Sequence, residues 1–277
     1  MNIFLTGATG FIGKNFLLIA LKKGHNVIAL SRKKQKFKHK NLKWVYGKIT
    51  KNFSNELMIS DVIVHLASEG VINKQISYKD AKQFNVNCSL KLFQNAVKNN
   101  CKKWIIAGSV SEYGESCFGK KKISINTKPR PRTSYEKTKF MFSKKILSLS
   151  KNKKAKCRLM RIFPVYGAGE NKKRLFPSVI HAAKNGKNFY VNNGDQIRDF
   201  TSVDFVSKVI LDACNFNKKK FTSTQIWHIS SCKPISVKNF TKKIWKQYKA
   251  KGKLIFNDMK NKNYNNYISE KKSVWII

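Results

Sequence analysis

The chain of 277 residues has 57 Lys and Arg against 14 Asp and Glu, which gives a formal net charge of +43. Its hydrophobic fraction of 42% is sufficient for a buried core and excludes an intrinsically disordered chain. Apolar runs such as 16–21 and 62–66 are too short to cross a bilayer, and a strand begins at residue 2. We therefore expect no signal peptide and no membrane partner, and predict a cytoplasmic protein.

The positive charge raises the question of a polyanionic partner, because nucleic acids and anionic surfaces attract such chains. Seven of the basic residues are Arg and the other 50 are Lys, distributed from end to end. Nucleic-acid readers favour clustered Arg, which contacts bases and phosphates with two donors at once. We therefore predict no specific nucleic-acid partner, and only non-specific polyanion binding at low salt. The six cysteines form no CxxC pair, so we predict reduced thiols and no metal site.

Strands and helices alternate along the first part of the chain. We predict strands over 2–6, 26–30, 61–67, 104–109 and 156–163, and helices over 12–23, over 79–99 and from residue 135 onward. This order predicts an α/β fold, a Rossmann doubly wound parallel sheet with a smaller C-terminal substrate-binding portion. The alternation weakens after Gly167. We therefore assign 1–165 to a dinucleotide-binding domain, to which 199–225 returns, and 166–198 and 226–277 to the substrate-binding portion.

A glycine-rich turn, TGATGFIG at 6–13, joins the first strand to the first helix. Gly7 permits a tight turn, Gly10 lets backbone N–H groups approach a pyrophosphate, and Gly13 lets the helix pack close to the sheet. The positive end of the helix dipole then faces the phosphates. The turn predicts a nicotinamide dinucleotide site whose contacts are Gly7, Thr9, Gly10, Phe11 and Ile12.

The end of the second strand bears on the choice between the two nicotinamide cofactors. An NAD site usually has an acidic residue there that accepts hydrogen bonds from the ribose 2′-hydroxyl, and this chain has Ser31 and Arg32 instead. The Arg32 guanidinium offers a planar fork of donors to a 2′-phosphate. The sequence favours NADP(H) and leaves NAD(H) as the alternative, since Arg32 could also be one more surface cation.

Tyr135 and Lys139 lie four residues apart, on one face of a predicted helix. A nearby ammonium favours the phenolate, so we expect Lys139 to lower the pKa of Tyr135. Two further Tyr and Lys pairs, 78/82 and 267/271, have the same spacing, and context separates them. Tyr135 follows Ser109 by 26 positions, and Ser109 ends a strand of the sheet, where ligands bind in open parallel sheets.

In combination, six motifs resemble the extended short-chain dehydrogenase/reductases of the NAD-dependent epimerase/dehydratase family, which act on nucleotide sugars. They are TGATGFIG (6–13), HLAS (65–68), GSVSEYG (108–114), YEKTK (135–139), RIFPVYGAGE (161–170) and GDQIRDF (194–200). The motifs follow the order and spacing of this family from residue 1 to about 240.

The resemblance implies roles for particular residues. It implies a catalytic triad of Ser109, Tyr135 and Lys139, with Tyr135 and Lys139 also contacting the cofactor. It also implies that Leu66, Ala67 and Asn85 contact the cofactor, that Ser109, Ser111 and Arg198 contact a nucleotide-sugar substrate, and that the protein is a homodimer formed through a pair of helices.

The chain departs from the family at several positions. The 4,6-dehydratases carry Asp-Glu after the catalytic hydroxyl, where this chain has Val110-Ser111, so dehydration is not expected. Lys48 stands where relatives have an Asp near the adenine, Pro164 replaces a frequent Asn, and Cys88 replaces a Gly. The chain also ends soon after Trp275, which predicts a reduced substrate lid.

Two reactions suit these residues. One is NADPH-dependent reduction of the C4 ketone of a nucleotide-linked 4-keto-deoxy sugar, with Tyr135 as proton donor, as in 4-ketoreductases of the CDP-abequose synthase and GDP-4-keto-6-deoxymannose reductase type. The alternative is an NAD-dependent 4-epimerase. The missing acid after the second strand and the compact C-terminal part favour the reductase. Two further alternatives are a non-catalytic dinucleotide sensor and a polyanion-binding protein.

Overall fold

The computed structural model describes residues 1–70, 76–119, 122–192, 194–217, 224–257 and 265–275. Its central layer is a seven-stranded sheet in the order β11-β6-β5-β4-β1-β2-β3, and every neighbouring pair of strands is parallel. The predicted doubly wound α/β class is therefore confirmed. The strands of this sheet are β1 (Asn2–Thr6), β2 (Asn26–Ser31), β3 (Leu42–Tyr46), β4 (Val62–His65), β5 (Lys103–Ser109), β6 (Lys156–Ile162) and β11 (Thr224–Ile229).

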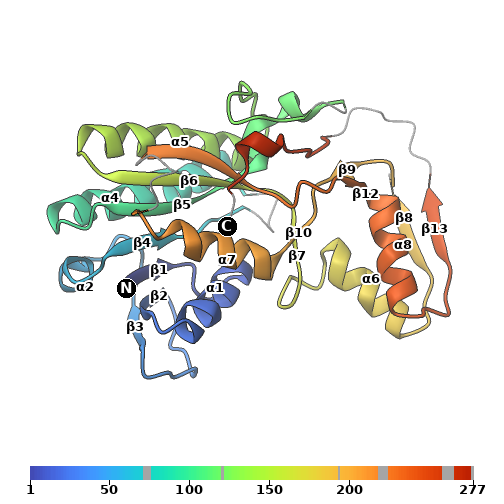
Figure 1. The fold of residues 1–277 in the computed structure, drawn as a ribbon, viewed down its shortest axis with the longest axis horizontal. Coiled ribbons are helices and arrows are strands. Elements are labelled where there is room, and N and C mark those ends of the chain that lie inside the picture. The colour runs from blue at the N-terminus through green and yellow to red at the C-terminus, as the bar shows by residue number, and fades with distance from the viewer. Residues whose placement is uncertain (71–75, 120–121, 193, 218–223, 258–264, 276–277) are drawn as a thin grey trace.

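Helices cover both faces of the sheet (Figure 1). Helices α1 and α7 pack together on one face, and α2, α4 and α5 lie on the other. The helices of the chain are α1 (Phe11–Lys22), α2 (Ser54–Met58), α3 (Tyr78–Lys82), α4 (Ser89–Lys98), α5 (Ser134–Asn152), α6 (Leu175–Lys184), α7 (Val203–Ala213) and α8 (Val237–Gln247).

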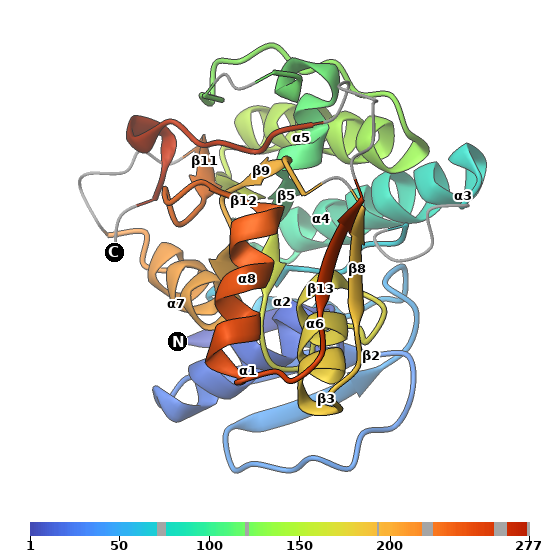
Figure 2. The ribbon, with the colours of Figure 1, turned by 90° about the vertical axis from the view of Figure 1, so that its right-hand side faces the viewer.

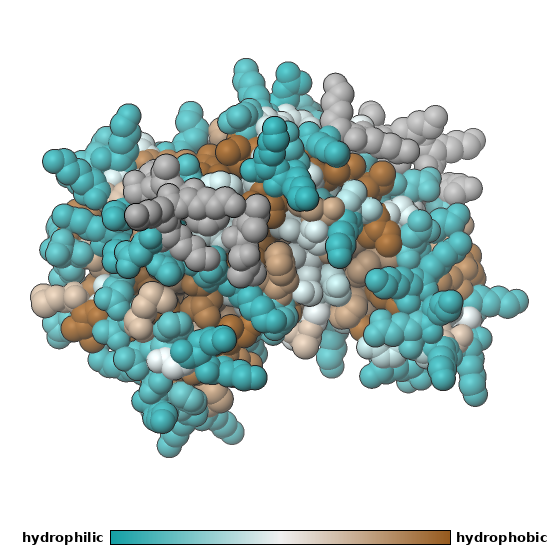
Figure 3. Space-filling view, viewed as in Figure 1, coloured by the Kyte–Doolittle hydropathy of each residue, from teal (hydrophilic) through white to brown (hydrophobic). Residues whose placement is uncertain are grey.

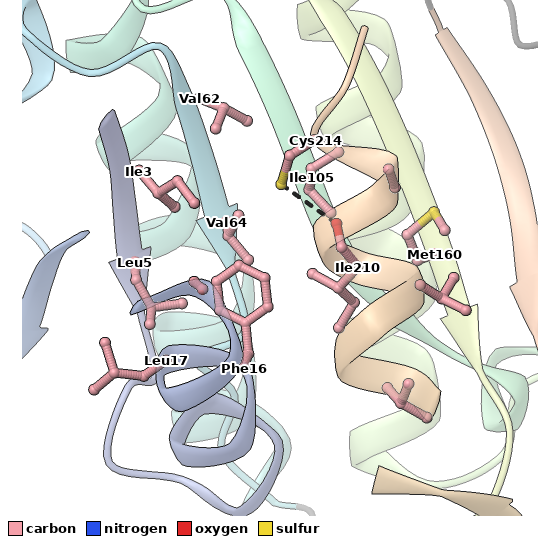
Figure 4. Packing of buried hydrophobic residues seen from close by; sticks show 14 of the residues in the cluster. Ile3, Leu5, Phe16, Leu17, Val62, Val64, Ile105, Met160, Ile210 and Cys214 are labelled. Carbon is pink, nitrogen blue, oxygen red and sulfur yellow. Dashed lines mark hydrogen bonds between the residues drawn. The ribbon is translucent and has the colours of Figure 1, made fainter. Parts of the chain in front are cut away.

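The alternating side chains of the strands fill both cores, which is why the strands are apolar throughout. In β1, Ile3 and Leu5 pack toward α1 and α7, whereas Phe4 packs toward α4 and α5. Figure 4 shows the first of these cores, with Phe16 of α1 and Ile210 of α7 over the strands. These layers hold the carboxyl ends of the strands at one edge of the sheet. The strand order reverses there between β1 and β4, which is where open α/β sheets bind ligands.

The predicted elements agree with observed ones, but their bounds differ in places, and β3, α2 and the elements of the C-terminal part were not predicted. The predicted helix over 79–99 is α3 and α4 joined by a π-helical segment, η1 (Gln83–Cys88). The predicted strand over 61–67 ends at His65, and the residues after it form a loop. Strand β3 was not predicted, because LKWVY lies next to polar, Lys-rich segments and is only partly buried.

The C-terminal part forms a second, smaller assembly beside the sheet (Figure 2). Its core joins α6 and α8 through Val179, Phe240 and Ile244. Its short strand pairs are β8 (Phe189–Asn192) with β13 (Leu254–Asn257), β9 (Ile197–Arg198) with β12 (Ile235–Ser236), and β7 (Val165–Tyr166) with β10 (Thr201–Ser202).

Strand β11 requires a correction to the predicted domain boundaries. The substrate-binding portion was predicted to resume at residue 226, but all of β11 pairs with β6 in the main sheet. Near the C-terminus, Trp275 also packs into the core on the α1 and α7 face. Residues 226–229 and Trp275 therefore belong with the dinucleotide-binding part, and the rest of the predicted division stays a prediction.

The surface is mostly hydrophilic (Figure 3), as expected for a chain with 57 Lys and Arg. Figure 3 shows hydrophilic side chains over most of one face, interrupted by small apolar areas. Among the described helices, none combines the length and the apolar character that a bilayer span requires. Four cysteines are buried and two are partly buried, and all six are free thiols.

Candidate active site

The glycine-rich turn leads from β1 into α1 at the carboxyl edge of the sheet. Gly7 has φ +75°, and a Cβ there would lie 2.7 Å from the backbone of Leu66 and of Ala67. A Cβ on Gly13 would lie 1.9 Å from the Gly7 carbonyl oxygen. Both positions therefore require glycine. Gly7 has a positive φ and lies close to a neighbouring backbone, and Gly13 lets α1 pack against the turn. Leu66 and Ala67 belong to the loop after β4 and border the turn directly.

The first turn of α1 is open to a ligand. Its N-cap is Gly10, which offers no side-chain hydrogen bond, and no acidic residue lies in the first turn. The N–H groups that begin the helix therefore have no helical acceptors. Thr9 and Gly10 are exposed, and Phe11 and Ile12 are half-buried. The predicted contacts of this turn thus surround a helix terminus whose backbone donors fit a pyrophosphate.

The polar residues beneath the turn are arranged in a buried chain. The Thr6 hydroxyl lies 2.8 Å from Nδ1 of His65, whose Nε2 lies 3.2 Å from the Ser89 hydroxyl. The Ala67 N–H donates to the Thr6 hydroxyl at 3.4 Å. Burial, and then the charge of Lys139, lower the pKa of His65 to about 3. His65 is therefore a neutral support that fixes the loop after β4.

Asn85 lies in the π-helical segment η1 and is buried. Its Oδ1 accepts from the Glu69 N–H at 2.9 Å and from the Ser68 hydroxyl at 3.2 Å. Its Nδ2 donates to the Glu69 carbonyl at 3.1 Å and to the Thr138 hydroxyl at 3.2 Å. All of its described partners are protein groups, so Asn85 ties the loop after β4 to α5. The structure supports a positioning function, and the predicted cofactor contact stays a prediction.

Ser31 and Arg32 differ in their surroundings at the end of β2. The Ser31 hydroxyl is buried and occupied by its own loop, since it donates to the Lys33 carbonyl at 2.7 Å and accepts from the Lys33 N–H at 3.2 Å. The Arg32 side chain is 73% exposed, and its guanidinium lies 3.5 Å from the Glu69 carboxylate. Arg32 therefore remains free to turn toward a ligand, whereas Ser31 mainly shapes the loop.

Ser109 ends β5 and begins a short 3-10 helix, η2 (Val110–Tyr113). Its hydroxyl accepts from the Ser111 N–H at 3.2 Å and lies 2.7 Å from the Ser111 hydroxyl. Both serines are half-buried. The two predicted substrate contacts therefore form one pair of hydroxyl groups at the carboxyl end of β5.

Tyr135 and Lys139 lie on the first turns of α5, which begins with the Thr133 and Glu136 capping box. The Ser109 and Ser68 side chains lie near the Tyr135 hydroxyl and favour its ionised form. The Lys139 ammonium is buried and donates to the Ala107 carbonyl on β5 at 2.6 Å. The fold thus brings Ser109, Tyr135 and Lys139 together from β5 and α5, as predicted for the triad.

The prediction that Lys139 lowers the pKa of Tyr135 is wrong for this structure. Burial raises the pKa of the Tyr135 phenol to about 12, and it outweighs the opposing effect of Ser109. The Glu112 carboxylate adds to the rise, while Arg174 opposes it. The Lys139 pKa is itself lowered by burial, against the effect of Glu112. The structure therefore holds Tyr135 as a neutral phenol, the form that donates a proton.

Arg198 reaches the same region from β9. Its guanidinium donates to the carbonyls of Ile197 and Asn265 and to Oε1 of Gln196, and it stacks on the Tyr267 ring at 4.5 Å. It lines an open pocket of about 530 Å³ between the first turn of α5 and the C-terminal segment. The other lining residues are Gly114, Phe118, Arg132, Thr133, Glu136, Asn265 and Tyr267. Arg198 and Tyr135 thus both lie near the N-terminal end of α5.

Two acidic residues were missed by the sequence reasoning. Glu112 follows Ser111 and is fully buried, with its carboxylate 3.0 Å from the Arg161 guanidinium. Glu170 has an 8% exposed side chain 3.7 Å from Arg174, and burial raises its pKa to about 7. GSVSEYG and RIFPVYGAGE contain these residues, but a motif alone does not tell which carboxylates turn inward. Among the described residues, no cluster of His, Cys, Asp and Glu has the arrangement of a metal site.

Comparison with known proteins agrees with this architecture. The model of the NAD dependent epimerase/dehydratase family matches residues 3–226. The CDP-abequose synthase of Salmonella typhimurium is 28% identical over 246 residues, which cover 86% of this chain and 78% of that protein. The UDP-glucose 4-epimerase uge1 of Schizosaccharomyces pombe is 22% identical over 272 residues, which cover 83% and 75%.

Among solved structures, MoeE5 in complex with UDP-glucose and NAD superimposes with a TM-score of 0.84 at 21% sequence identity. The superposition covers 98% of this chain and 89% of that one. It shows that the fold is shared along nearly the whole chain, including the smaller C-terminal assembly.

Proposed function

Because the chain belongs to the NAD dependent epimerase/dehydratase family of nucleotide-sugar enzymes, we propose that it reduces the C4 ketone of a nucleotide-linked 4-keto-deoxy sugar. The observation that carries this proposal is the placement of the Tyr135 phenol on the first turn of α5 with Ser109 and Ser111 at the carboxyl end of β5. Burial keeps this phenol neutral, which is the form that donates a proton to the oxygen of a ketone as it is reduced.

Each residue of the triad has a part in this reaction. Tyr135 donates its proton to O4 of the sugar as the ketone becomes an alcohol. Ser109, with Ser111 beside it, hydrogen bonds to the same oxygen and orients the ketone. Lys139, whose ammonium donates to the Ala107 carbonyl, contacts the cofactor in this proposal. When bound, a reduced nicotinamide supplies the hydride.

The proposed cofactor is NADP(H), with NAD(H) as the alternative. The turn at 7–13 fits the pyrophosphate, and Gly7 and Gly13 leave no space for a Cβ. Arg32 is exposed at the end of β2, where a 2′-phosphate would lie, and its one described ion pair is with Glu69. We propose that Leu66 and Ala67 border the bound dinucleotide and that Arg198 binds the substrate diphosphate.

Dehydration is not proposed, even though the turn after Ser109 contains an acid. Both oxygens of Glu112 are occupied, Oε1 by the Ser109 N–H at 2.8 Å and Oε2 by Arg161. Its carboxylate is therefore unavailable to remove a proton from a sugar carbon. This arrangement agrees with the absence of the Asp-Glu pair of the 4,6-dehydratases.

A 4-epimerase is the second candidate, because the similarity to UDP-glucose 4-epimerase extends over 83% of the chain. An epimerase first oxidises C4, so its tyrosine must act as a base. We propose that the protein is a homodimer in either case, formed through a pair of helices.

An assay with purified protein separates the two reactions. We expect NADPH to be consumed in stoichiometric amount with one of a panel of CDP-, GDP-, UDP- and dTDP-linked 4-keto-6-deoxy sugars, and CDP-abequose to support the reverse reaction with NADP⁺. Interconversion of UDP-glucose and UDP-galactose without net cofactor turnover would replace the reductase by the epimerase. Dinucleotide binding without either reaction would instead support a non-catalytic sensor.

A further inference from the structure

Glu112 is a buried acid beside the triad to which the mechanism so far gives no part. It is 0% exposed, in the turn that connects Ser109 to Tyr113. A buried carboxylate is costly unless its charge and its lone pairs are satisfied. Glu112 meets this condition, because its charge is paired with Arg161 and one of its oxygens accepts from the Ser109 N–H.

The carboxylate is held between two neighbouring strands. Gly108 of β5 and Arg161 of β6 are partners in the sheet register, and Oε2 of Glu112 lies 3.0 Å from Nε of Arg161. A Cβ on Gly108 would lie 2.9 Å from Oε1 of Glu112, so glycine at this position leaves room for the acid. The ion pair therefore lies within the carboxyl edge of the sheet.

The same carboxylate fixes the catalytic hydroxyl. Oε1 of Glu112 accepts from the Ser109 N–H at 2.8 Å, and the Ser109 hydroxyl accepts from the Ser111 N–H. These two bonds form a capping box, which sets the conformation of the turn. The orientation of Ser109 toward Tyr135 thus depends on a carboxylate three residues later in the chain.

We propose that Glu112 is a positioning residue that orients Ser109 through the Ser109 N–H and is itself held by Arg161, so that its negative charge lies in the turn beside Tyr135. The part of this inference that concerns catalysis rests on the proposed reductase function. The electrostatic part concerns only the protein and can be tested without a substrate.

The charges around Tyr135 show why Glu112 is the group to change. Arg174, from the turn before α6, favours the phenolate, whereas Glu112 from η2 favours the phenol. Lys139 is directed to the Ala107 carbonyl, and His65 of β4 is neutral, with a pKa of about 3. The ionic residues of α3 are exposed, and Arg161 is paired with Glu112 itself. Removing the charge of Glu112 therefore leaves burial alone to oppose Arg174, which is itself paired with Glu170.

The ionisation of Tyr135 can be followed with tyrosine labelled with ¹³C at the ring carbon that bears the hydroxyl, because the NMR signal of this carbon moves when the phenol ionises. The Tyr135 signal is assigned by its absence in Tyr135→Phe. We expect Glu112→Gln, which keeps the size and the acceptor for Ser109, to ionise at a pH lower by about one unit or more. Glu112→Asp keeps the charge and should stay close to the wild type. Glu56→Gln, which breaks a distant ion pair with Lys43, is the matched control and should not shift the signal.

Removing one partner of a buried ion pair can prevent folding. The double variant Glu112→Gln with Arg161→Gln replaces both charges by amides and tests the same shift if the single variant does not fold. An unchanged Tyr135 titration in folded Glu112→Gln, or in the folded double variant, would overturn the proposal. If the titration shifts but no 4-keto sugar is reduced, the electrostatic role stands and the proposed reaction fails.

Discussion

The guanidinium of Arg32 lies 3.5 Å from the carboxylate of Glu69, so an ion pair joins the loop after β2 to the loop after β4. The two side chains are 73% and 39% exposed, and such a pair adds little to stability in water. The ion pair instead changes the net charge that a bound ligand encounters at this position. Arg32 attracts a 2′-phosphate, and Glu69 both repels it and competes for Arg32.

Substitutions at these two positions should change cofactor affinity in opposite directions. We expect Arg32→Ala to weaken NADPH binding about tenfold and to leave NADH binding nearly unchanged, because a phosphate loses its charged donor. Glu69→Gln should strengthen NADPH binding several-fold. Fluorescence titration at one fixed salt concentration measures both, with Lys34→Ala as the control for total charge. Equal losses for NADH and NADPH in Arg32→Ala would contradict a 2′-phosphate site.

The triad predicts a loss of activity without a loss of cofactor binding. Tyr135→Phe removes the proton donor and should lower kcat by about 10²- to 10⁴-fold, while the dissociation constant for the dinucleotide stays within a few-fold. Tyr78→Phe is the matched control, since Tyr78 also has a Lys four residues later but is 40% exposed. Comparable rates for Tyr135→Phe and Tyr78→Phe would remove Tyr135 from the mechanism.

The packing of α1 against the turn predicts a strict requirement for glycine at position 13. A Cβ on Gly13 would lie 1.9 Å from the Gly7 carbonyl oxygen, so Gly13→Ala must displace the helix from the turn. We expect a loss of about 1–3 kcal/mol in the free energy of unfolding, together with loss of dinucleotide binding. Gly24→Ala has no atom within 4 Å of its new Cβ and serves as a control for backbone strain alone.

His65 and His228 are buried and neutral, and each is expected to reduce the stability of the protein in acid; His228 is the one to test. Burial lowers the pKa of His228 to about 3, below its unfolded value of 6.5, so the folded state binds fewer protons. Stability from this group is complete above pH 6.5 and falls as the pH drops toward 3. At pH 5 the loss is about 2 kcal/mol for one such histidine. Urea unfolding at pH 7 and pH 5 should therefore show a smaller loss in His228→Gln than in the wild type. Equal losses in the two proteins would argue against a buried neutral His228.

The fold was largely predictable because it depends on features that are local in sequence. The apolar strands and the glycine turn at 6–13 occur in an order that allows few arrangements other than a doubly wound sheet. Strand β3 escaped prediction because its partly buried residues carry a weak apolar signal. The π segment at Asn85 depends on contacts with Glu69 and Thr138, which no local pattern contains.

The candidate site was predictable in its members but not in its electrostatics. Motifs and spacing placed Ser109, Tyr135 and Lys139 in one site, and the structure has them on β5 and α5, while their catalytic roles stay a prediction. The expected effect of Lys139 on the Tyr135 pKa failed, because the ammonium contacts the Ala107 carbonyl and burial outweighs charge. The pairing of Glu112 with Arg161 joins residues 49 positions apart and becomes visible only once β5 and β6 are neighbours.

Isotope transfer tests the central claim most directly. The protein is incubated with NADPH deuterated on the transferring face of the nicotinamide and with a nucleotide-linked 4-keto-6-deoxy sugar, and the product is analysed by mass spectrometry and NMR. The account predicts one deuterium at C4 of the sugar in the wild type and none in Tyr135→Phe. No deuterium at C4 of any 4-keto sugar tested, together with interconversion of UDP-glucose and UDP-galactose without consumption of NADPH, would contradict it and support the epimerase.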